Sequence, residues 1–477
     1  MTLASILGIL GWIERAKGSF PKLLQPTSSC LRQSGIVAAA VFISLAFSVS
    51  TSASTFTVNT LADHAVGSCN PADCTLREAI RAANNSAGAD TINFSSGLTG
   101  TITLQSDFGG QLLITESVTI NGPGARVLTV SGNGTSRAFQ INPLLLSPAT
   151  TVNISGLTIT GGIGAINKVA GVPVTPGPGG GILNTGGATL NLTEVNLSAN
   201  NIPIFGGIST NLLIGGGIAT VGTDTTPTVT NITRCTIANN SAVGGGGGVG
   251  NTTTGLNPLG GVTTVTNSTI TNNVTGAAGG GLINIGGTIN LTNNTVSHNS
   301  SVATGGGVVN VAGISPVGVV NIRNTIVARN NAKIVGGVLN LSDDVLGIFN
   351  SLGNNLIGNN TNAAVSFEAS AFIGTDPQLN AHADLVGSVS ITTTVIDPKL
   401  GPIINNGGPT NTRALLSGSP AIDHGNSCVF SNTCASNTNG QNPPFALTTD
   451  QRSTGFTRLF GATVDIAAPT RSKAARR

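Results

Sequence analysis

The sequence is poor in aromatic and charged residues. It contains no tyrosine and one tryptophan, and only 8% of its 477 residues are charged. Disordered chains combine high charge with few aliphatic residues, whereas 39% of this chain is hydrophobic, so disorder is not expected. A formal net charge of only +3 does not supply the basic face that a nucleic-acid partner requires. The near absence of Trp and Tyr also disfavours a carbohydrate platform built on stacked rings.

Residues 1–53 are predicted to be a secretory leader. An apolar run over residues 35–49 follows Arg32 and precedes small residues, and cleavage is expected after Ala53. The alternative is an uncleaved membrane anchor, although this run is short for crossing a bilayer. Removing the leader takes away four basic residues and one acidic residue, which leaves 17 of each. We therefore expect a secreted chain with a net charge near zero, which contacts a membrane only through its leader. Residues 467–477 are expected to form a disordered basic tail.

Two closely spaced cysteine pairs predict two small disulfide loops, as is common in exported proteins. Cys69 and Cys74 form the first pair, and Cys428 and Cys434 form the second. A zinc site is the alternative, but no histidine stands at ligand spacing beside either pair.

An internal repeat is the strongest pattern in the chain. Each copy has a Thr-Ile or Thr-Val pair, then Asn, a Gly run and an aliphatic-x-Asn segment, and successive pairs are 33, 26 and 30 residues apart. Aliphatic residues alternate with polar ones, which predicts short strands. Repeats of this kind predict a parallel β-helix over residues 97–396, with Asn ladders and Gly at the corners. The pairs begin at Thr236, Thr269, Thr295 and Thr325, with weaker copies at Thr158, Asn196 and Leu356.

Two repeat positions carry residues that can do chemistry elsewhere. Cys235 aligns with Ser268, Asn294 and Asn324, so we expect an inert thiol filling a small position in a coil rather than a nucleophile. His298 stands at the end of a strand where other copies have Asn, and we expect a surface or corner role.

One helix is predicted near the start of the mature chain, in the segment "CTLREAIRAANNS". Thr75 and Glu78 form a capping-box pattern. The apolar positions follow a helical spacing and define one face; they are Leu76, Ala79, Ile80 and Ala83. We expect residues 54–96 to form a cap on the first coil, with one strand, the first cysteine loop and this helix.

The segment "CTLREAIRAAN" resembles the CSLREA-type domain, with Thr75 at the position of that motif's serine. The segment from Asp397 to Arg452 resembles the choice-of-anchor Q domain, and the repeats are similar to the Gly/Asn repeats of polymorphic outer-membrane proteins. This resemblance implies a secreted or surface-exposed bacterial right-handed parallel β-helix of the pectate-lyase-like kind, without an assigned activity. The motif residues are Cys74, Leu76, Arg77, Glu78, Ala79, Ile80, Gly407, Gly408, Pro409, Ser419, Pro420, Ala421, Ile422, Asp423, Asp450, Gln451 and Arg452.

The segment over residues 397–466 is expected to close the solenoid as a hydrogen-bonded end cap. One departure from the family pattern lies at Val464, where "VDIAAPT" replaces a Cys-Asp-Ile-Gly-Ala-Phe-Glu-like strand. The last strand is therefore expected to differ from that of the family.

The distribution of acidic residues bears on catalysis. Lyases of this shape use clustered acids to hold Ca²⁺ together with a base, and glycosidases use two close carboxylates. Between residues 150 and 341 the sequence has only Glu194 and Asp224, in different repeats. We therefore assign no catalytic residue. Asp63 and Asp73, which flank the first cysteine loop, are weak Ca²⁺ candidates; turn and helix-cap roles are the alternative.

Other acids offer weaker candidates. Asp343 and Asp344 can imitate a glycosidase pair, but we expect a solvated turn, because no third acid is near them in the sequence. Asp423, His424 and Asp450 allow a hydrolytic or metal role, but hydrogen bonds within the closing region are the expected use.

We therefore predict a non-enzymatic secreted or cell-surface scaffold, of adhesive or structural type, whose partner is an extracellular polymer or a surface protein. No cofactor is expected beyond the Ca²⁺ candidate. The alternatives are a polysaccharide-active lyase or glycosidase of the β-helix type and a glycan-binding module.

Overall fold

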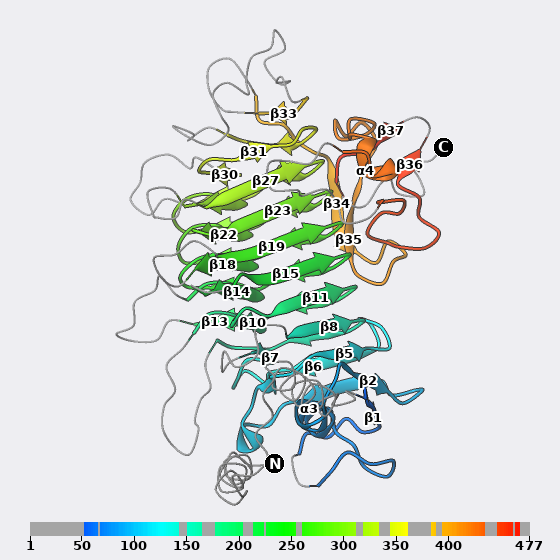
Figure 1. Cartoon of the computed structure of the whole chain (residues 1–477). Helices are drawn as coiled ribbons and strands as arrows, with labels where there is room; N and C mark the ends of the chain where they lie inside the picture. Colours follow the sequence, from blue (N-terminus) through cyan, green and yellow to red (C-terminus); the bar gives the residue numbers. More distant parts are fainter. Residues whose placement is uncertain are drawn as a thin grey trace, which may run out of the picture. The chain divides into compact units, whose positions relative to one another are not determined.

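The computed structural model shows an all-β protein built on parallel strands, which confirms the predicted parallel β-helix (Figure 1). Four stacked sheets run through the coils, and all strand pairs within them are parallel. The description covers residues 52–64, 67–142, 150–164, 177–203, 213–223, 226–253, 260–311, 318–332, 344–360, 383–387, 394–434, 446–460 and 463–467. The predicted leader and basic tail fall almost entirely outside these residues.

Sheets A and B are the two longest sheets, with ten strands each. Sheet A consists of β1 (Thr55–Val58), β2 (Asp90–Phe94), β5 (Val118–Asn121), β8 (Thr151–Ser155), β11 (Thr189–Thr193), β15 (Thr228–Thr233), β19 (Gly261–Thr266), β23 (Thr288–Thr292), β27 (Val319–Arg323) and β31 (Asn350–Ser351). Sheet B consists of β3 (Gly100–Thr103), β6 (Leu128–Ser131), β9 (Thr158–Thr160), β12 (Asn196–Ser198), β16 (Thr236–Ala238), β20 (Thr269–Thr271), β24 (Thr295–Ser297), β28 (Ile326–Ala328), β32 (Leu356–Ile357) and β33 (Leu385–Val386).

Sheets C and D complete the coils. Sheet C consists of β4 (Leu112–Ile114), β7 (Phe139–Ile141), β10 (Ile182–Asn184), β14 (Ile218–Gly222), β18 (Val249–Thr253), β22 (Leu282–Ile285), β26 (Val308–Asn310) and β30 (Val345–Leu346). Sheet D consists of the short strands β13 (Asn201–Ile202), β17 (Ser241–Ala242), β21 (Val274–Thr275), β25 (Ser300–Ser301) and β29 (Asn331–Ala332). A central coil passes from sheet A to B, D and C before it returns to A one level further along the stack.

The core is a stack of aliphatic columns inside the coils. In the column of sheet A listed below, each inward residue pairs with its counterpart in the next coil. Every residue of this column is at most 1% exposed. Burial of one such side chain contributes about 1.5–3 kcal/mol, so the alternating aliphatics of the repeat account for the core. One column contains Ile92, Ile120, Ile154, Leu192, Ile232, Val265, Leu291 and Ile322.

The corners on either side of sheet B use left-handed backbone, which Asn tolerates better than most residues. At the corner after sheet B, Asn239, Asn272 and His298 have φ values of 58°, 56° and 58°. His298 therefore occupies an Asn position at a corner, as predicted. At the corner before sheet B, Arg234 has φ 53° and Asn267 has φ 50°.

The register corrects one part of the repeat alignment. Thr295 pairs with Ile326 rather than with Thr325. The coil is therefore one residue longer than the spacing of the Thr pairs indicated, and the column that contains Cys235 continues through Thr325 instead of Asn324. The error arose because Thr-Ile also occurs one position too early in that copy.

The N-terminal cap contains the predicted helix, α3 (Leu76–Asn85). Thr75 caps it through a capping box with Glu78, and the predicted apolar face is buried. These apolar side chains join Val58 and Ile92 in the main core cluster, so the helix packs on the first coils. A short 3-10 helix, η1 (Ser106–Phe108), follows β3.

The closing segment, residues 397–466, lies along sheet B. It contains two antiparallel pairs, β34 (Leu400–Ile404) with β35 (Thr412–Leu415) and β36 (Leu459–Phe460) with β37 (Thr463–Val464), and the helix α4 (Cys428–Ser431). Figure 1 shows β34 and β35 running along the stack of coils rather than across its end.

Contacts and burial confirm this lateral position. Asp397 binds Arg329 near one end of the stack, and Asn411 binds Arg126 near the other. The outward residue of β16, Thr236, is 1% exposed, whereas that of β12, Asn196, is partly exposed. The expectation of an end cap is therefore corrected, because the described contacts of the closing segment are made with the side of the solenoid. At β28 and β32 the outward residues are apolar, and they pack against apolar residues of this segment.

Candidate functional site

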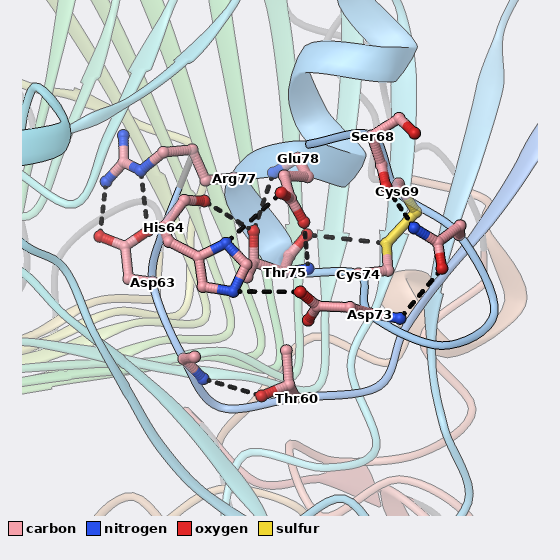
Figure 2. A network of polar contacts seen from close by, with 12 residues as sticks. Thr60, Asp63, His64, Ser68, Cys69, Asp73, Cys74, Thr75, Arg77 and Glu78 are labelled. Carbon is pink, nitrogen blue, oxygen red and sulfur yellow. Dashed lines mark hydrogen bonds and ion pairs between the residues drawn. A yellow bond between two sulfur atoms is a disulfide. The ribbon is translucent and has the colours of Figure 1, made fainter. Parts of the chain in front are cut away.

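Asp63 and Arg77 form a buried ion pair in the N-terminal cap (Figure 2). Arg77 Nε donates to Asp63 Oδ1 over 2.7 Å, and Nη2 donates to Oδ2 over 2.8 Å. The backbone N–H of Gln105 also donates to Asp63 Oδ2, over 2.6 Å. The Asp63 carboxylate is thus committed to a guanidinium and an amide, and a calcium ion there would face the charge of Arg77.

His64 lies between two carboxylates, as Figure 2 shows. Its Nε2 is 3.4 Å from Asp73 Oδ2, and its Nδ1 is 3.4 Å from Glu78 Oε1. Asp73 is half-exposed, whereas the Glu78 side chain is 2% exposed. The second Ca²⁺ candidate, Asp73, therefore has the basic residue His64 as its neighbour, and the acidic residue Glu78 lies on the other side of that ring. Neither His64 nor Glu78 was predicted as a ligand.

The His64 cluster has a donor set of one nitrogen and two carboxylates, with ligand atoms within 4.8 Å of one another. Because Asp73 and Glu78 face different ring nitrogens, one ion can use only one of these pairs. With Nε2 and Asp73 as ligands, Glu78 would hold the other ring nitrogen, as carboxylates do beside metal-bound histidines. Imidazole with carboxylate suits Zn²⁺ and related ions better than Ca²⁺, which prefers oxygen alone.

Local sequence explains why this cluster is ordered. Glu78 Oε2 accepts the backbone N–H of Thr75 over 3.0 Å in the capping box. Thr75 Oγ1 in turn donates to the carbonyl of His64 over 3.0 Å. The predicted disulfide between Cys69 and Cys74 is formed, and it closes the loop that carries Asp73. A hollow of about 360 Å³ next to the cluster is lined by residues that include Cys69 and Glu78.

Gln451 joins the closing segment to the coils. Its Nε2 donates to the carbonyl of Cys235 over 2.9 Å and to Thr410 Oγ1 over 3.0 Å, and its Oε1 accepts from Thr269 Oγ1 over 2.7 Å. Gln451 is fully buried. Gln451 thus links two neighbouring coils to the closing segment through hydrogen bonds.

The other motif residues of this segment have structural contacts. Asp450 and Arg452 are buried and form an ion pair at 2.5 Å, and the Arg452 guanidinium carbon lies 4.2 Å from the centre of the Phe456 ring. A Cβ on Gly407 would lie 2.7 Å from Phe456, and one on Gly408 would lie 2.4 Å from the Arg452 Cα. The two glycines therefore permit the turn that carries Pro409 to pack against the Arg452 backbone.

The remaining motif residues lie nearer α4. Ser419 Oγ donates to the carbonyl of Pro398 over 2.6 Å. Ala421, which follows Pro420 in the chain, is buried, and Ile422 is partly buried in the same apolar cluster. The second predicted disulfide, between Cys428 and Cys434, is formed.

Asp423 and His424 are exposed, while Asp450 is fully buried against Arg452. Asp423 accepts from Thr463 Oγ1 over 3.1 Å, and His424 Nδ1 lies 2.7 Å from the carbonyl of Ile422. These side-chain contacts of Asp423 and His424 lie within the closing segment.

Glu194 and Asp344, two described acids of the coils, have structural contacts. Glu194 pairs with Arg234 at 2.9 Å, and Asp344 accepts the backbone N–H groups of Asn330 and Asn359, both over 2.7 Å. Asp343 and Asp224 lie outside the described residues. The prediction of a solvated turn is wrong for Asp344, which is 1% exposed.

The side chain of Cys235 is fully buried, and that of His298 is partly buried. Cys235 is a free thiol with no exposed surface, and burial raises its pKa to about 12. Its Sγ accepts the backbone N–H of Val195, while its own N–H donates to Ser268 Oγ. Burial, with Arg413 and Arg329 nearby, lowers the pKa of His298 to about 4.

Comparison with known proteins found no match among family models, curated proteins or solved structures. The resemblance to CSLREA-type and choice-of-anchor domains therefore stays a prediction. Within the part of the chain that the structure describes, no helix has the length and apolar character needed to cross a membrane.

Proposed function

We propose that this chain is a secreted or cell-surface scaffold without enzymatic activity, which contacts an extracellular polymer or surface protein through its solenoid. The proposal rests on the contacts of three acidic residues in the coils, whose carboxylates are occupied by partners within the protein. Asp344 accepts a hydrogen bond from the buried Asn330 of its own coil, and Asp384 accepts one from the buried Asn355 of the preceding coil. Glu194 is paired with Arg234. A glycosidase or lyase needs carboxylates that converge on substrate or Ca²⁺ instead.

The position of the closing segment supports the same proposal. It occupies the outer face of sheet B over the central coils, where Thr236, Thr269 and Thr271 are buried. A substrate groove on that part of sheet B would be filled by the protein itself. Sheet A keeps partly exposed outward side chains and offers the surface for contacts.

The test uses the full chain and a panel of plant, algal and bacterial polysaccharides, with Ca²⁺ and with EDTA. Both new chain ends and retained protein are recorded. We expect no new chain ends under either condition. Cleavage that EDTA abolishes would contradict the proposal and would favour a metal-dependent polysaccharide lyase or glycosidase, with the His64 cluster as the first region to mutate.

A further inference from the structure

The outward side chains of sheet A form an ordered, uncharged surface. We call the outward residues of β5, β8, β11, β15, β19 and β23 the Thr/Asn face. In β8 they are Thr151, Asn153 and Ser155, and in β11 they are Thr189, Asn191 and Thr193, directly in register. The same positions in the other four strands hold only Thr, Asn and Val. No charged residue interrupts the face.

Asparagine amides run along the middle of this face as a ladder. Asn231 Nδ2 donates to Asn191 Oδ1, and Asn191 Nδ2 donates to Asn153 Oδ1, each over 2.8 Å. Asn153 Nδ2 continues the ladder to Thr119 Oγ1 over 3.0 Å. An amide has two N–H donors and two acceptor lone pairs. Each ladder member therefore keeps one donor and one acceptor for a partner in front of the sheet, and its orientation is held by its neighbours.

Most of the Thr/Asn face is accessible where other faces are covered, while Thr266 in β19 and Asn290 in β23 are buried. Its members in β8, β11 and β15 are all partly exposed. By contrast, every residue of β16, β20 and β24 in sheet B is buried, as is every residue of β10, β14 and β26 in sheet C. Figure 1 shows the strands of sheet A side by side, with β34 and β35 beside them rather than across them.

Strand geometry sets the spacing of the face. Neighbouring strands lie about 4.8 Å apart, and alternate residues along a strand about 6.6 Å apart. Six strands, five with three outward positions and β5 with two, thus make a lattice of about 24 Å by about 13 Å. This area is well below the roughly 800 Å² per partner of a stable protein interface. The lattice suits a partner that repeats its own groups over a long distance, so that many weak contacts add up.

The chemistry of the face selects the kind of partner. Anionic polymers are recognised by Arg and Lys, which the face does not contain. Protein interfaces have apolar cores enriched in aromatic residues, and these are also absent. Hydroxyl and amide groups, each both donor and acceptor, match the hydroxyl and acetamido groups of uncharged sugars.

From these observations we infer that the Thr/Asn face binds an uncharged polysaccharide in ordered, insoluble form, with chains lying flat on sheet A. The inference rests on the proposed scaffold function and names its partner. Binding needs no induced fit, because the ladder holds the amides in place before contact.

The test measures retention of the full chain on insoluble chitin and on insoluble cellulose, with soluble pectate as an anionic competitor. The variant Thr189→Lys/Thr193→Lys places two charges beside Asn191 without removing the ladder. The variant Thr189→Val/Thr193→Val keeps the shape and removes two hydroxyls. The control Thr101→Lys/Thr129→Lys adds the same charges at paired outward positions of β3 and β6 in sheet B. Thermal unfolding checks that all variants remain folded.

We expect the wild type and the control to be retained on at least one solid, and pectate not to compete. Retention of the Lys variant should fall about tenfold or more, equivalent to about 1.4 kcal/mol of binding free energy. Retention of the Val variant should lie between that of the wild type and that of the Lys variant. Equal retention of the Lys variant and the control would contradict the assignment of binding to the Thr/Asn face, while polysaccharide binding by the chain would still stand. No retention of the wild type would overturn the inference, whereas release of new chain ends would overturn the scaffold proposal itself.

Discussion

Asn330 donates both its backbone N–H and its Nδ2 to the same carboxylate oxygen of Asp344, over 2.7 and 2.8 Å. This pair ends a buried ladder in which each asparagine donates to the Oδ1 of the next coil. The preceding members are Asn200, Asn240, Asn273 and Asn299. The earlier steps take their acceptor from the following coil, whereas Asn330 takes it from Asp344 of its own coil. This last position requires an acceptor and no donor, and a carboxylate meets that need.

Asp344→Ala should lower the free energy of unfolding by at least about 3 kcal/mol, since it leaves buried N–H groups of Asn330 and Asn359 without an acceptor. Asp344→Asn keeps one acceptor oxygen and should cost less. Urea unfolding of both variants measures the difference. Equal losses would contradict the acceptor role, because the oxygen that Asn keeps would then contribute nothing.

Arg77→Met should destabilise the cap by about 3–5 kcal/mol, because it leaves the buried Asp63 carboxylate without its partner. Adding Asp63→Asn to the same variant should recover part of the loss, since the uncompensated charge is then removed. A double-mutant cycle from urea unfolding gives the coupling between the two residues. A coupling near zero would contradict the ion pair as the main contact.

Gln451→Leu should loosen the closing segment, because the Cys235 carbonyl and the Thr269 hydroxyl lose a buried partner. We expect a loss of about 1–3 kcal/mol and faster proteolysis within residues 397–466. His424→Ala, an exposed change in the same segment, is the control and should leave the rate unchanged. Equal rates for both variants would contradict the linking role of Gln451.

Cys235 should resist thiol reagents in the folded protein and react at once in denaturant, since its thiol is buried and its pKa is raised to about 12. The unfolded thiol loses its proton first, so this residue makes folding less favourable as pH rises above about 9 towards 12. Cys235→Ser should remove that dependence. Rapid labelling of Cys235 itself in the native chain, located by peptide mapping, would contradict its buried position.

His298 should make stability fall as the solution is acidified. Its pKa in the folded state, about 4, lies below its ordinary value of 6.5, so the unfolded state takes up a proton first between these values. His298→Asn suits the left-handed corner, as at Asn239 and Asn272, and should flatten the change between pH 6.5 and 4. Unfolding midpoints of both proteins over this range provide the measurement. Parallel curves would contradict the assigned titration.

Local patterns were predictable because neighbouring residues alone determine them. The alternation of aliphatic and polar residues determined the strands, and the Thr75–Glu78 spacing determined the start of α3. Both disulfides join cysteines that are close in sequence, so their loops leave little choice of partner. The coil length was less well determined, since a Thr-Ile pair at Thr325 imitates the true register at Ile326.

The sequence by itself thus determined that the chain stacks short parallel strands around an aliphatic core, because each repeat carries its own alternation. Only the tertiary structure decided that the closing segment lies against sheet B, because residues such as Gln451 and Thr269 are 182 positions apart and no short-range pattern links them. It also decided that His64 meets Asp73 and Glu78, since a disulfide loop and a helix cap bring them together. The accessible face of sheet A follows from the same placement, which covers one sheet and leaves another open.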